Sequence, residues 1–305
     1  MNDSLRGQLR QQIQKLDSIS TAPAILKPLL DLMRQPSDAI KLDKVVEMVS
    51  YDAAIASQCV RMANSPIYGR HQTETVRAAV MSLGLERVRS MLLAFCMNQV
   101  ISADKWVMDP NAFWRHSLGC GLVAQRIAKR IGYPEAEKAY LAGLIHDLGI
   151  LVNSVLYTDK LRECFDRAAS NHAPLHMSEE QILGFNHCDT GQMLCEHWGL
   201  SKDLTDCAAY HHHVNPQTSV APLVCIIHLS DLLCRTRHLG YGYEEIMGVD
   251  LSGDVAWENL CINYPQLENM DLIRFTLDID GSMEEIVATV DSVFGPKRMA
   301  APATS

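Results

Sequence analysis

The chain has 305 residues, enough for one large or two modest domains, and its 48% apolar residues support a substantial hydrophobic core. Its net charge of −9 disfavours association with a nucleic-acid backbone, which argues against a DNA-binding regulator. The ten cysteines include no Cys-x-x-Cys pair, and no apolar run approaches the ~20 residues of a membrane span. We therefore expect a cytoplasmic protein with reduced thiols and no membrane contact.

Residues 1–105 carry apolar side chains at helical spacing on a polar background. Asp52 is a candidate N-cap for one helix, and Gly84 is a candidate end for another. No segment of the chain shows the period of two that predicts a β-strand. The sequence therefore predicts an all-α fold that begins with a helical lobe, residues 1–105, which has no ionisable cluster of its own.

Residues 106–238 continue as helices with clearer boundaries. Asp109-Pro110 predicts a helix start, because an N-cap is followed directly by proline. Ser178-x-x-Gln181 resembles a capping box that opens a later helix. We expect this segment to form a helical bundle with a metal site. It is followed by a C-terminal extension, residues 239–305, which has further helices and a disordered tail from residue 296.

The segment Ala139–Val152 is apolar except for the adjacent pair His146–Asp147, and this pattern predicts one helix that is buried on most sides. A buried imidazole and carboxylate need partners, because an unpaired buried charge is very costly. Metal ions are one kind of partner, and a backbone carbonyl and a nearby helix terminus are the alternative. Side chains of adjacent helical residues point about 100° apart, so the pair suits two nearby ions or an aspartate that bridges both.

Several motifs occur in order along the chain: Asn64-Ser-Pro-Ile-Tyr-Gly69, Ser82-Leu-Gly84, Phe113-Trp-x-His-Ser117, Ala142-Gly-Leu-Ile-His-Asp-Leu-Gly149, Asn186-His187 with Gly191, Trp198-Gly-Leu200 and His211-His212. Over about residues 18–235 the chain resembles the HDOD domain of bacterial signalling proteins. The resemblance implies an all-helical fold in which an HD-phosphohydrolase-like bundle follows a family-specific helical lobe. It also implies a regulatory output module with no assigned substrate, and we expect a protein partner in a signalling pathway.

The resemblance further implies a set of metal ligands. The ligands of HD-type phosphohydrolases fall on His116, His146, Asp147 and Asp231, and those added in dinuclear relatives fall on His187, His211 and His212. Such imidazole and carboxylate donors fit one or two ions of iron, manganese or zinc. The alternative is that His116 and His187 are hydrogen-bonded core histidines, and that the histidines at 211–213 favour the negative end of a helix.

The sequence differs from the HD-type enzymes at three features that bear on catalytic activity. The lysine that follows the His-Asp pair in the dinuclear relatives is Ile150 here, and the glutamate one turn before the first histidine is Ala112. The Gly-Tyr-Pro signature is missing, and we do not take Gly240-Tyr-Gly-Tyr243 as a substitute. We therefore expect a signal-transduction output protein with a metal-capable core. The alternative is a metal-dependent phosphodiesterase that acts on a nucleotide or cyclic dinucleotide.

Other candidate residues have weaker support. Arg115 lies beside a predicted ligand, but its helical spacing predicts a solvated side chain. His228 lies three residues before Asp231 and is expected to support the site or the core rather than to bind metal. Cys188, Cys195 and His197 match no zinc-binding spacing, so the two cysteines are expected to be core thiols.

Overall fold

The computed structural model describes residues 3–16, 26–33, 35, 39–69, 72–101, 103–214, 221–237, 239–243, 245, 253–267 and 272–295. The regular elements among these residues are helices, and none is a strand, so the predicted all-α fold is confirmed. The tail for which we predicted disorder, residues 296–305, lies outside the described residues.

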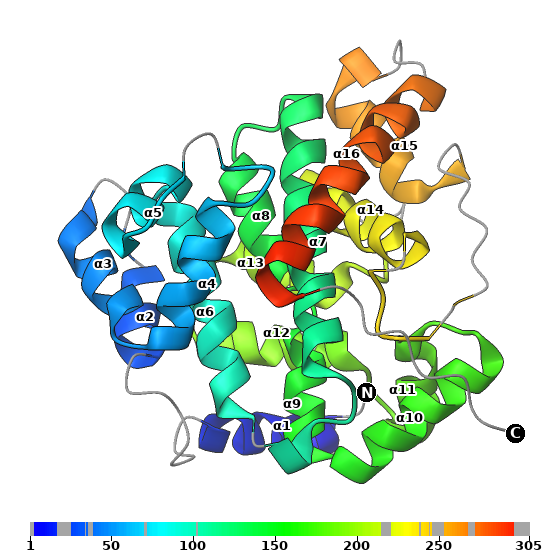
Figure 1. The fold of residues 1–305 in the computed structure, drawn as a ribbon. Helices are drawn as coiled ribbons and strands as arrows, with labels where there is room; N and C mark the ends of the chain where they lie inside the picture. The colour runs from blue at the N-terminus through cyan, green and yellow to red at the C-terminus, as the bar shows by residue number, and fades with distance from the viewer. Residues whose placement is uncertain are drawn as a thin grey trace, which may run out of the picture.

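The first helices form a lobe to one side of the molecule (Figure 1). This lobe contains α2 (Leu26–Met33), α3 (Leu42–Ser50), α4 (Ala53–Ala63), α5 (Val76–Leu83) and α6 (Leu85–Val100), while α1 (Asp3–Leu16) packs against α12 (His187–His197). Asp52 caps α4 as predicted, since its Oδ1 accepts hydrogen bonds from the N–H groups of Ala54 at 2.8 Å and Ile55 at 3.0 Å. Gly84 ends α5 with a φ of +84°, a conformation that glycine adopts without strain.

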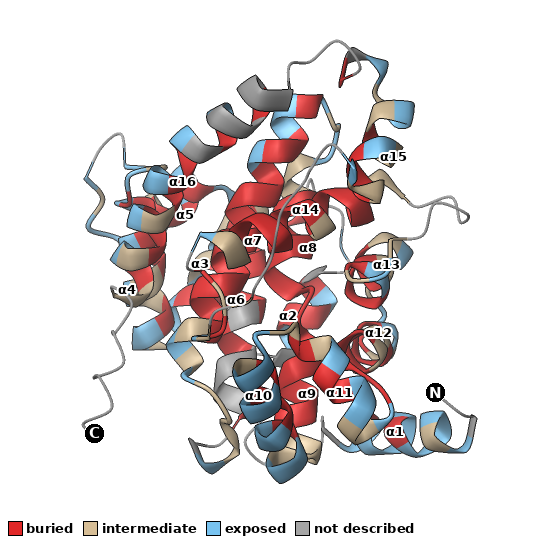
Figure 2. Cartoon of the chain, turned by 90° about the vertical axis from the view of Figure 1, so that its right-hand side faces the viewer, coloured by how far each residue is buried: buried red, intermediate tan, exposed pale blue. Residues whose placement is uncertain are grey.

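The other helices form the larger part of the molecule, and α7 (Pro110–Ile131) lies at its centre (Figure 1). They are α8 (Ala136–Ile145), α9 (Leu148–Leu156), α10 (Thr158–Asn171), α11 (Leu175–Leu183), α12, α13 (Lys202–Tyr210), α14 (Pro222–Thr236), α15 (Val255–Asn263) and α16 (Leu272–Phe294), with 3₁₀ turns at Ala103–Lys105 and Pro265–Leu267. Helix α7 contacts α8, α14 and α16 and is buried over most of its length (Figure 2). The domain boundaries at residues 105 and 238 stay predictions.

The start of α7 agrees with the prediction. Asp109 is its N-cap and accepts a hydrogen bond from the N–H of Asn111 at 2.9 Å, and Pro110 occupies the first turn. The helix ends before Gly132, which has the left-handed φ of +76°. Both ends are therefore fixed by local sequence, and the buried stretch between them can present side chains to several neighbouring helices.

Two glycines allow close contact between the backbones of neighbouring helices near His146 and Asp147. A Cβ added at Gly149 in α9 would lie 1.8 Å from the carbonyl oxygen of His187, and one at Gly143 in α8 would lie 2.7 Å from the carbonyl oxygen of Cys120. Neither position can hold a side chain without a shift of the backbone. These contacts bring α9 against the start of α12, and α8 against α7.

The apolar stretch Ala136–Leu156 is long enough to cross a membrane by length and composition, with a mean hydropathy of 1.5. Inside the protein, 83% of its apolar window is buried, so packing in the core accounts for its composition. We predicted one continuous helix over Ala139–Val152, and this is wrong, because the chain turns at His146 and Asp147 between α8 and α9. Asp147 leaves the helical region with φ −101° and ψ 13°.

The predicted capping box at Ser178 is also wrong. Helix α11 begins earlier, at Leu175, and Ser178 is buried within it. A capping box occurs instead at α12, where the side chain of Asn186 accepts from the backbone of Asp189 and the carboxylate of Asp189 accepts from the N–H of Asn186. This box fixes the start of the helix whose first residue is His187.

Arg115 is not solvated, contrary to the prediction. Its side chain is buried and forms an ion pair with Asp291 at 2.5 Å, and it donates to the carbonyl of Gly295 at the end of α16. The prediction fails because α16 covers this face of α7. Helix α16 lies far from Arg115 in the sequence, so no pattern near Arg115 indicates the contact. Helix α16 also contacts α4, so it joins the first lobe to the central helix.

Candidate metal centre

The carboxylate of Asp147 lies at the centre of a buried cluster of histidines. Its Oδ2 is 3.0 Å from Nε2 of His146 and 3.4 Å from Nε2 of His116. Its Oδ1 is 3.2 Å from Nε2 of His187 and 3.2 Å from Nε2 of His211. The side chain of Asp147 is only 2% exposed, so bulk water does not screen these contacts. The two oxygens of one carboxylate thus face two different pairs of imidazoles.

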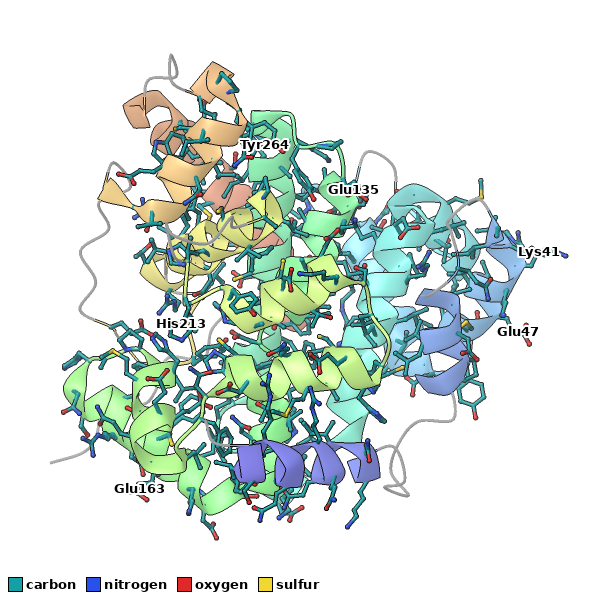
Figure 3. The ribbon with its side chains drawn as sticks, turned by 180° about the vertical axis from the view of Figure 1, so that it is seen from behind. Lys41, Glu47, Glu135, Glu163, His213 and Tyr264 are labelled. Atoms are coloured by element: carbon teal, nitrogen blue, oxygen red, sulfur yellow. The ribbon has the colours of Figure 1, made fainter. Side chains whose placement is uncertain are left out.

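Asp231 on α14 extends the cluster. Its Oδ1 is 3.3 Å from Nε2 of His116, and its Oδ2 is 3.6 Å from Nδ1 of His212. The other ring nitrogen of His212 is 3.1 Å from Nε2 of His187. The next residue, His213, marks the edge of the cluster beside α11, where it lies 3.6 Å from Glu180 (Figure 3). All seven residues predicted to bind metal are therefore brought together, although they come from helices and turns that are far apart in the chain.

The donor atoms fall into two groups, and within each group they lie no more than 4.8 Å apart. The first group is His116, Cys120, His146 and Asp231, and the second is Asp147, His187, His211 and His212. The neighbours His146 and Asp147 thus belong to different groups, while Asp147 also turns one oxygen toward the first group. The turn between α8 and α9 makes this division possible.

The tautomers of four of the imidazoles follow from their hydrogen bonds. The Nδ1 atoms of His116, His146, His211 and His187 lie 2.5 to 3.0 Å from the carbonyls of Leu239, Gly143 and Cys207 and the carboxylate of Glu179, respectively. Since these oxygens only accept, each Nδ1 carries a proton, and Nε2 of the neutral ring presents a lone pair. Four lone pairs therefore point toward carboxylate oxygens, an arrangement that needs protons or cations between them.

The pKa values of the imidazoles and of Asp147 also indicate that positive charge is stabilised in the cluster. Burial lowers the pKa of His116, but hydrogen bonds with Asp147 and Asp231 raise it to about 10. Burial likewise lowers the pKa of His187, while the nearby carboxylates of Glu179 and Asp147 raise it to about 10. Burial raises the pKa of Asp147, yet the nearby imidazoles hold it well below its usual range. A bound cation would take the place of the imidazole protons.

The distances within the cluster fit ligands of one ion. Zinc–nitrogen and zinc–oxygen bonds of about 2.0–2.2 Å at a tetrahedral angle place the two donors about 3.3 Å apart. The distance is 3.2 Å between Asp147 Oδ1 and both of its imidazole neighbours, and 3.3 Å between His116 and Asp231. Nε2 of His146 and Oδ1 of Asp147 have no hydrogen-bond partner among the described residues, which is costly for buried atoms. The cluster thus suggests metal binding, and its donors do not choose among iron, manganese and zinc.

Glu179 and Tyr241 touch the cluster and were missed from the sequence. Glu179 is fully buried in α11 and accepts hydrogen bonds from the backbone N–H of His187 at 3.0 Å and from its Nδ1–H at 2.5 Å. The hydroxyl of Tyr241 donates to Oδ2 of Asp147, and its ring centroid lies 4.6 Å from that of His116. We did not take Gly240–Tyr243 as a substitute for the Gly-Tyr-Pro signature, but its first tyrosine, Tyr241, is hydrogen-bonded to Asp147 at the centre of the cluster.

Cys120 and Arg235 were missed as well, although their spacing gives a signal. Each lies one helical turn after a predicted ligand, Cys120 after His116 and Arg235 after Asp231, and residues four apart share a helix face. The guanidinium of Arg235 is 2.9 Å from Oδ2 of Asp231 and 2.6 Å from Oε2 of Glu245. Two carboxylates therefore compensate this buried cation.

The weaker candidates lie outside both donor groups. His228 donates its Nδ1–H to the carbonyl of His211 at 2.6 Å, and its Nε2 is 3.2 Å from Asp254, so its expected supporting role is confirmed. Cys188 and Cys195 are buried free thiols, as predicted.

The HDOD domain family model matches residues 19–214, well over half of the chain. The chain therefore belongs to the HDOD domain family. This assignment accounts for the order of the motifs and for the arrangement of a helical lobe before the bundle that holds the cluster.

Solved structures share the fold. An HDOD domain protein of unknown function from Geobacter sulfurreducens is 24% identical, with a TM-score of 0.75, and the match covers 96% of this chain and 99% of that one. A "putative signal transduction protein" from Marinobacter aquaeolei VT8 is 20% identical, with a TM-score of 0.70, over 94% of this chain and 65% of that one. A "putative phosphohydrolase" from Shewanella amazonensis SB2B is 17% identical, with a TM-score of 0.67, over 92% and 97%.

A curated relative is an uncharacterized protein of Treponema pallidum (strain Nichols), which is 23% identical over 235 residues. The match covers 75% of this chain but only 45% of the relative, so the chain spans less than half of that protein's length.

Proposed function

We propose that the chain is a cytoplasmic bacterial signalling module that holds one or two divalent transition-metal ions in its core and acts through a protein partner rather than on a substrate. The observation that carries this proposal is the burial of the cluster, in which every candidate donor residue is buried except His212, whose burial is intermediate. His116, His146 and His211 are fully buried, and the hydroxyl of Tyr241 is hydrogen-bonded to Asp147. Catalytic metal sites keep an open position for water or substrate, whereas structural sites are filled by protein donors.

The two donor groups define which residues would hold the ions. His116, His146 and Asp231 would hold one, and His187, His211 and His212 would hold the other, with an oxygen of Asp147 facing each. Bound there, such ions supply Lewis-acid chemistry toward phosphate. In a closed cluster, their main effect is to stabilise the native state, because the unfolded chain does not assemble the donors.

Two residues where a cation for phosphate could stand, among those that the structure describes, also support a regulator. Ile150, at the position where the dinuclear enzymes have lysine, is fully buried among apolar side chains. Arg235 does lie beside the cluster, but it is paired with Asp231 and Glu245. A substrate phosphate would have to break these ion pairs before Arg235 could stabilise its charge.

The second candidate is a metal-dependent phosphodiesterase that acts on a nucleotide or cyclic dinucleotide. One observation favours it: Asp147 turns one oxygen toward each donor group, and two-metal hydrolases place their ions about 3.5–4 Å apart. The name of the Shewanella protein points the same way for that protein.

Metal content tests the proposal. The purified protein should contain about one or two transition-metal ions per chain, by comparison with other His/Asp sites. The variant Asp147→Ala should lose them, because this carboxylate contacts both groups. Adjacent histidines provide a matched pair: His212→Ala should lose metal and His213→Ala should retain it, since His213 is outside both groups and its side chain is 52% exposed. Failure of the wild type to take up added iron, manganese or zinc would refute the proposal.

Turnover separates the two candidates. We expect no hydrolysis of cyclic dinucleotides or of a generic phosphodiester by the metal-loaded protein. Turnover on the order of 1 per second or faster, typical of enzymes, would instead establish the phosphodiesterase if Asp147→Ala abolished it.

A further inference from the structure

Cys120 occupies a position in the first donor group that the His and Asp motifs do not account for. It lies one helical turn after His116 on α7, so both side chains leave the same face of the helix. Both residues are fully buried. The Sγ atom of Cys120 lies 3.5 Å from Nε2 of His116, the ring nitrogen that faces Asp231.

This distance is the one expected for two ligands of a single ion. A zinc–nitrogen bond of about 2.0–2.1 Å and a zinc–sulfur bond of about 2.3 Å, at a tetrahedral angle, separate nitrogen and sulfur by about 3.6 Å. The neighbouring distance from His116 to Asp231 is 3.3 Å, close to the value for nitrogen and oxygen. The donor atoms of Cys120, His116, His146 and Asp231 all lie within 4.8 Å of one another. They can therefore surround one point.

Two neighbouring atoms show why the first group would take a fourth donor from Cys120. Nε2 of His146 is buried and has no hydrogen-bond partner among the described residues, so it points into the group unsatisfied. Oδ2 of Asp147, the other candidate for a fourth donor, already accepts the hydroxyl of Tyr241. The thiol of Cys120 is hydrogen-bonded to the thiol of Cys234, and such a bond is weak, so it competes less with an ion than the hydroxyl of Tyr241 does at Asp147.

We propose that Cys120 is a thiolate ligand of the ion held by His116, His146 and Asp231, an inference that rests on the proposed metal centre. Binding breaks the S–H bond and forms a metal–sulfur bond, and the proton leaves to solvent. The two positions then differ in chemistry. The first offers two nitrogens, one sulfur and one oxygen, and the second offers three nitrogens and one oxygen. Thiolate favours zinc or iron over manganese, so the first position selects the softer ion.

X-ray absorption spectroscopy of the zinc-loaded wild type tests the ligand directly. We expect a sulfur scatterer at about 2.3 Å from zinc. With cobalt in place of zinc, we expect a thiolate-to-cobalt charge-transfer band in the near ultraviolet. Cys120→Ser should lose both signals and bind zinc at least roughly tenfold more weakly, since even the loss of an outer partner costs 10–100-fold.

Two other cysteines provide matched controls. Cys188 has its Sγ 3.9 Å from the ring of His211 in the second group, and Cys234 packs on α14 near Gly119. Neither belongs to a donor group, so Cys188→Ser and Cys234→Ser should retain the sulfur signals.

The possible outcomes distinguish a failure of the Cys120 proposal from a failure of the proposed metal centre. Zinc that binds the wild type with only nitrogen and oxygen neighbours would overturn the role of Cys120 and leave the metal centre standing. A sulfur signal that survives in Cys120→Ser, or disappears in Cys188→Ser, would overturn it too. Wild type that binds no metal would refute both proposals. The wild-type spectrum decides the presence of sulfur even if a variant fails to fold.

Discussion

Replacement of Glu179 by glutamine would remove one negative charge from the support of the metal cluster and leave its hydrogen bonds in place. Oε2 of Glu179 accepts from the N–H and the Nδ1–H of His187, and Oε1 accepts from the side-chain amide of Asn153 at 2.9 Å. Oδ1 of Asn153 is buried and has no hydrogen-bond partner among the described residues. If the amide of Asn153 flips, this oxygen can accept from the new glutamine, so Glu179→Gln tests charge alone.

These contacts set the expected loss of interaction free energy at His187. Hydrogen bonds to a charged group contribute about 1.5–3 kcal/mol, and neutral ones contribute about 0.5–1.5 kcal/mol. Two bonds to His187 would each weaken by about 1 kcal/mol, or about 2 kcal/mol together. A neutral partner also makes the imidazole of His187 a poorer donor to metal, and such outer partners affect metal affinity by about 10–100-fold.

Competition with a chromophoric chelator measures the effect. We expect Glu179→Gln to bind metal about 10–100-fold more weakly than the wild type. The matched control is Glu180→Gln, which removes the same charge from the next residue, where the side chain is 48% exposed and lies against His213. Wild-type affinity in Glu179→Gln would show that its charge does not act through His187. An equal loss in Glu180→Gln would point to net charge rather than to this contact.

Four further perturbations test the cluster and the helix packing around it. Chelation should lower the melting temperature by roughly 5–10 °C, since an ion at a hundredfold excess over its Kd contributes about 2.7 kcal/mol; an unchanged melt would exclude a stabilising ion. Tyr241→Phe should raise metal affinity in the chelator assay, because it frees Oδ2 of Asp147, and weaker binding would make the hydroxyl a support instead. Gly149→Ala should destabilise the protein by about 3 kcal/mol or more in denaturant melts, because its Cβ meets a carbonyl at 1.8 Å. Gly281→Ala, in open space within α16, should stabilise by about 0.5–1 kcal/mol, and equal effects of the two would refute the packing argument.

Local sequence signals predicted those parts of the fold that local interactions determine. Asp52 and Asp109 cap helices where expected, and Gly84 ends one, because caps and left-handed glycines act within a few residues. The capping box at Ser178 shows the limit of such patterns. The residues fit the motif, but Pro174 already starts the helix one turn earlier.

The break at His146–Asp147 could not be read from hydrophobicity. An apolar run around the pair predicts a continuous helix, and only the assembled site shows why the helix stops. A turn sends His146 to one donor group and Asp147 to the other, which adjacent positions on a helix do not easily achieve. Gly149 then allows the following helix to reach His187.

The family resemblance predicted the candidate donor residues, and it did not predict the residues that contact them. Glu179 and Glu180 are adjacent identical residues, yet one is fully buried under His187 and the other is half exposed. Helical periodicity assigned Arg115 to solvent, because nothing near it in the sequence indicates that α16 returns to cover it. Contacts between segments far apart in the chain decide these cases, and they carry no local pattern.

The same long-range contacts connect the cluster to the rest of the molecule. Arg115 precedes His116 on α7 and is held by Asp291 of α16. Thr289, on the same helix, accepts a hydrogen bond from the backbone N–H of Ile67 at 3.4 Å, in the turn that follows α4. Helix α16 thus contacts both the neighbour of a candidate metal donor and the first lobe. If the proposed ion and protein partner exist, α16 offers a physical connection between the buried cluster and the first lobe, because coupling between sites can be carried by packed elements that contact both.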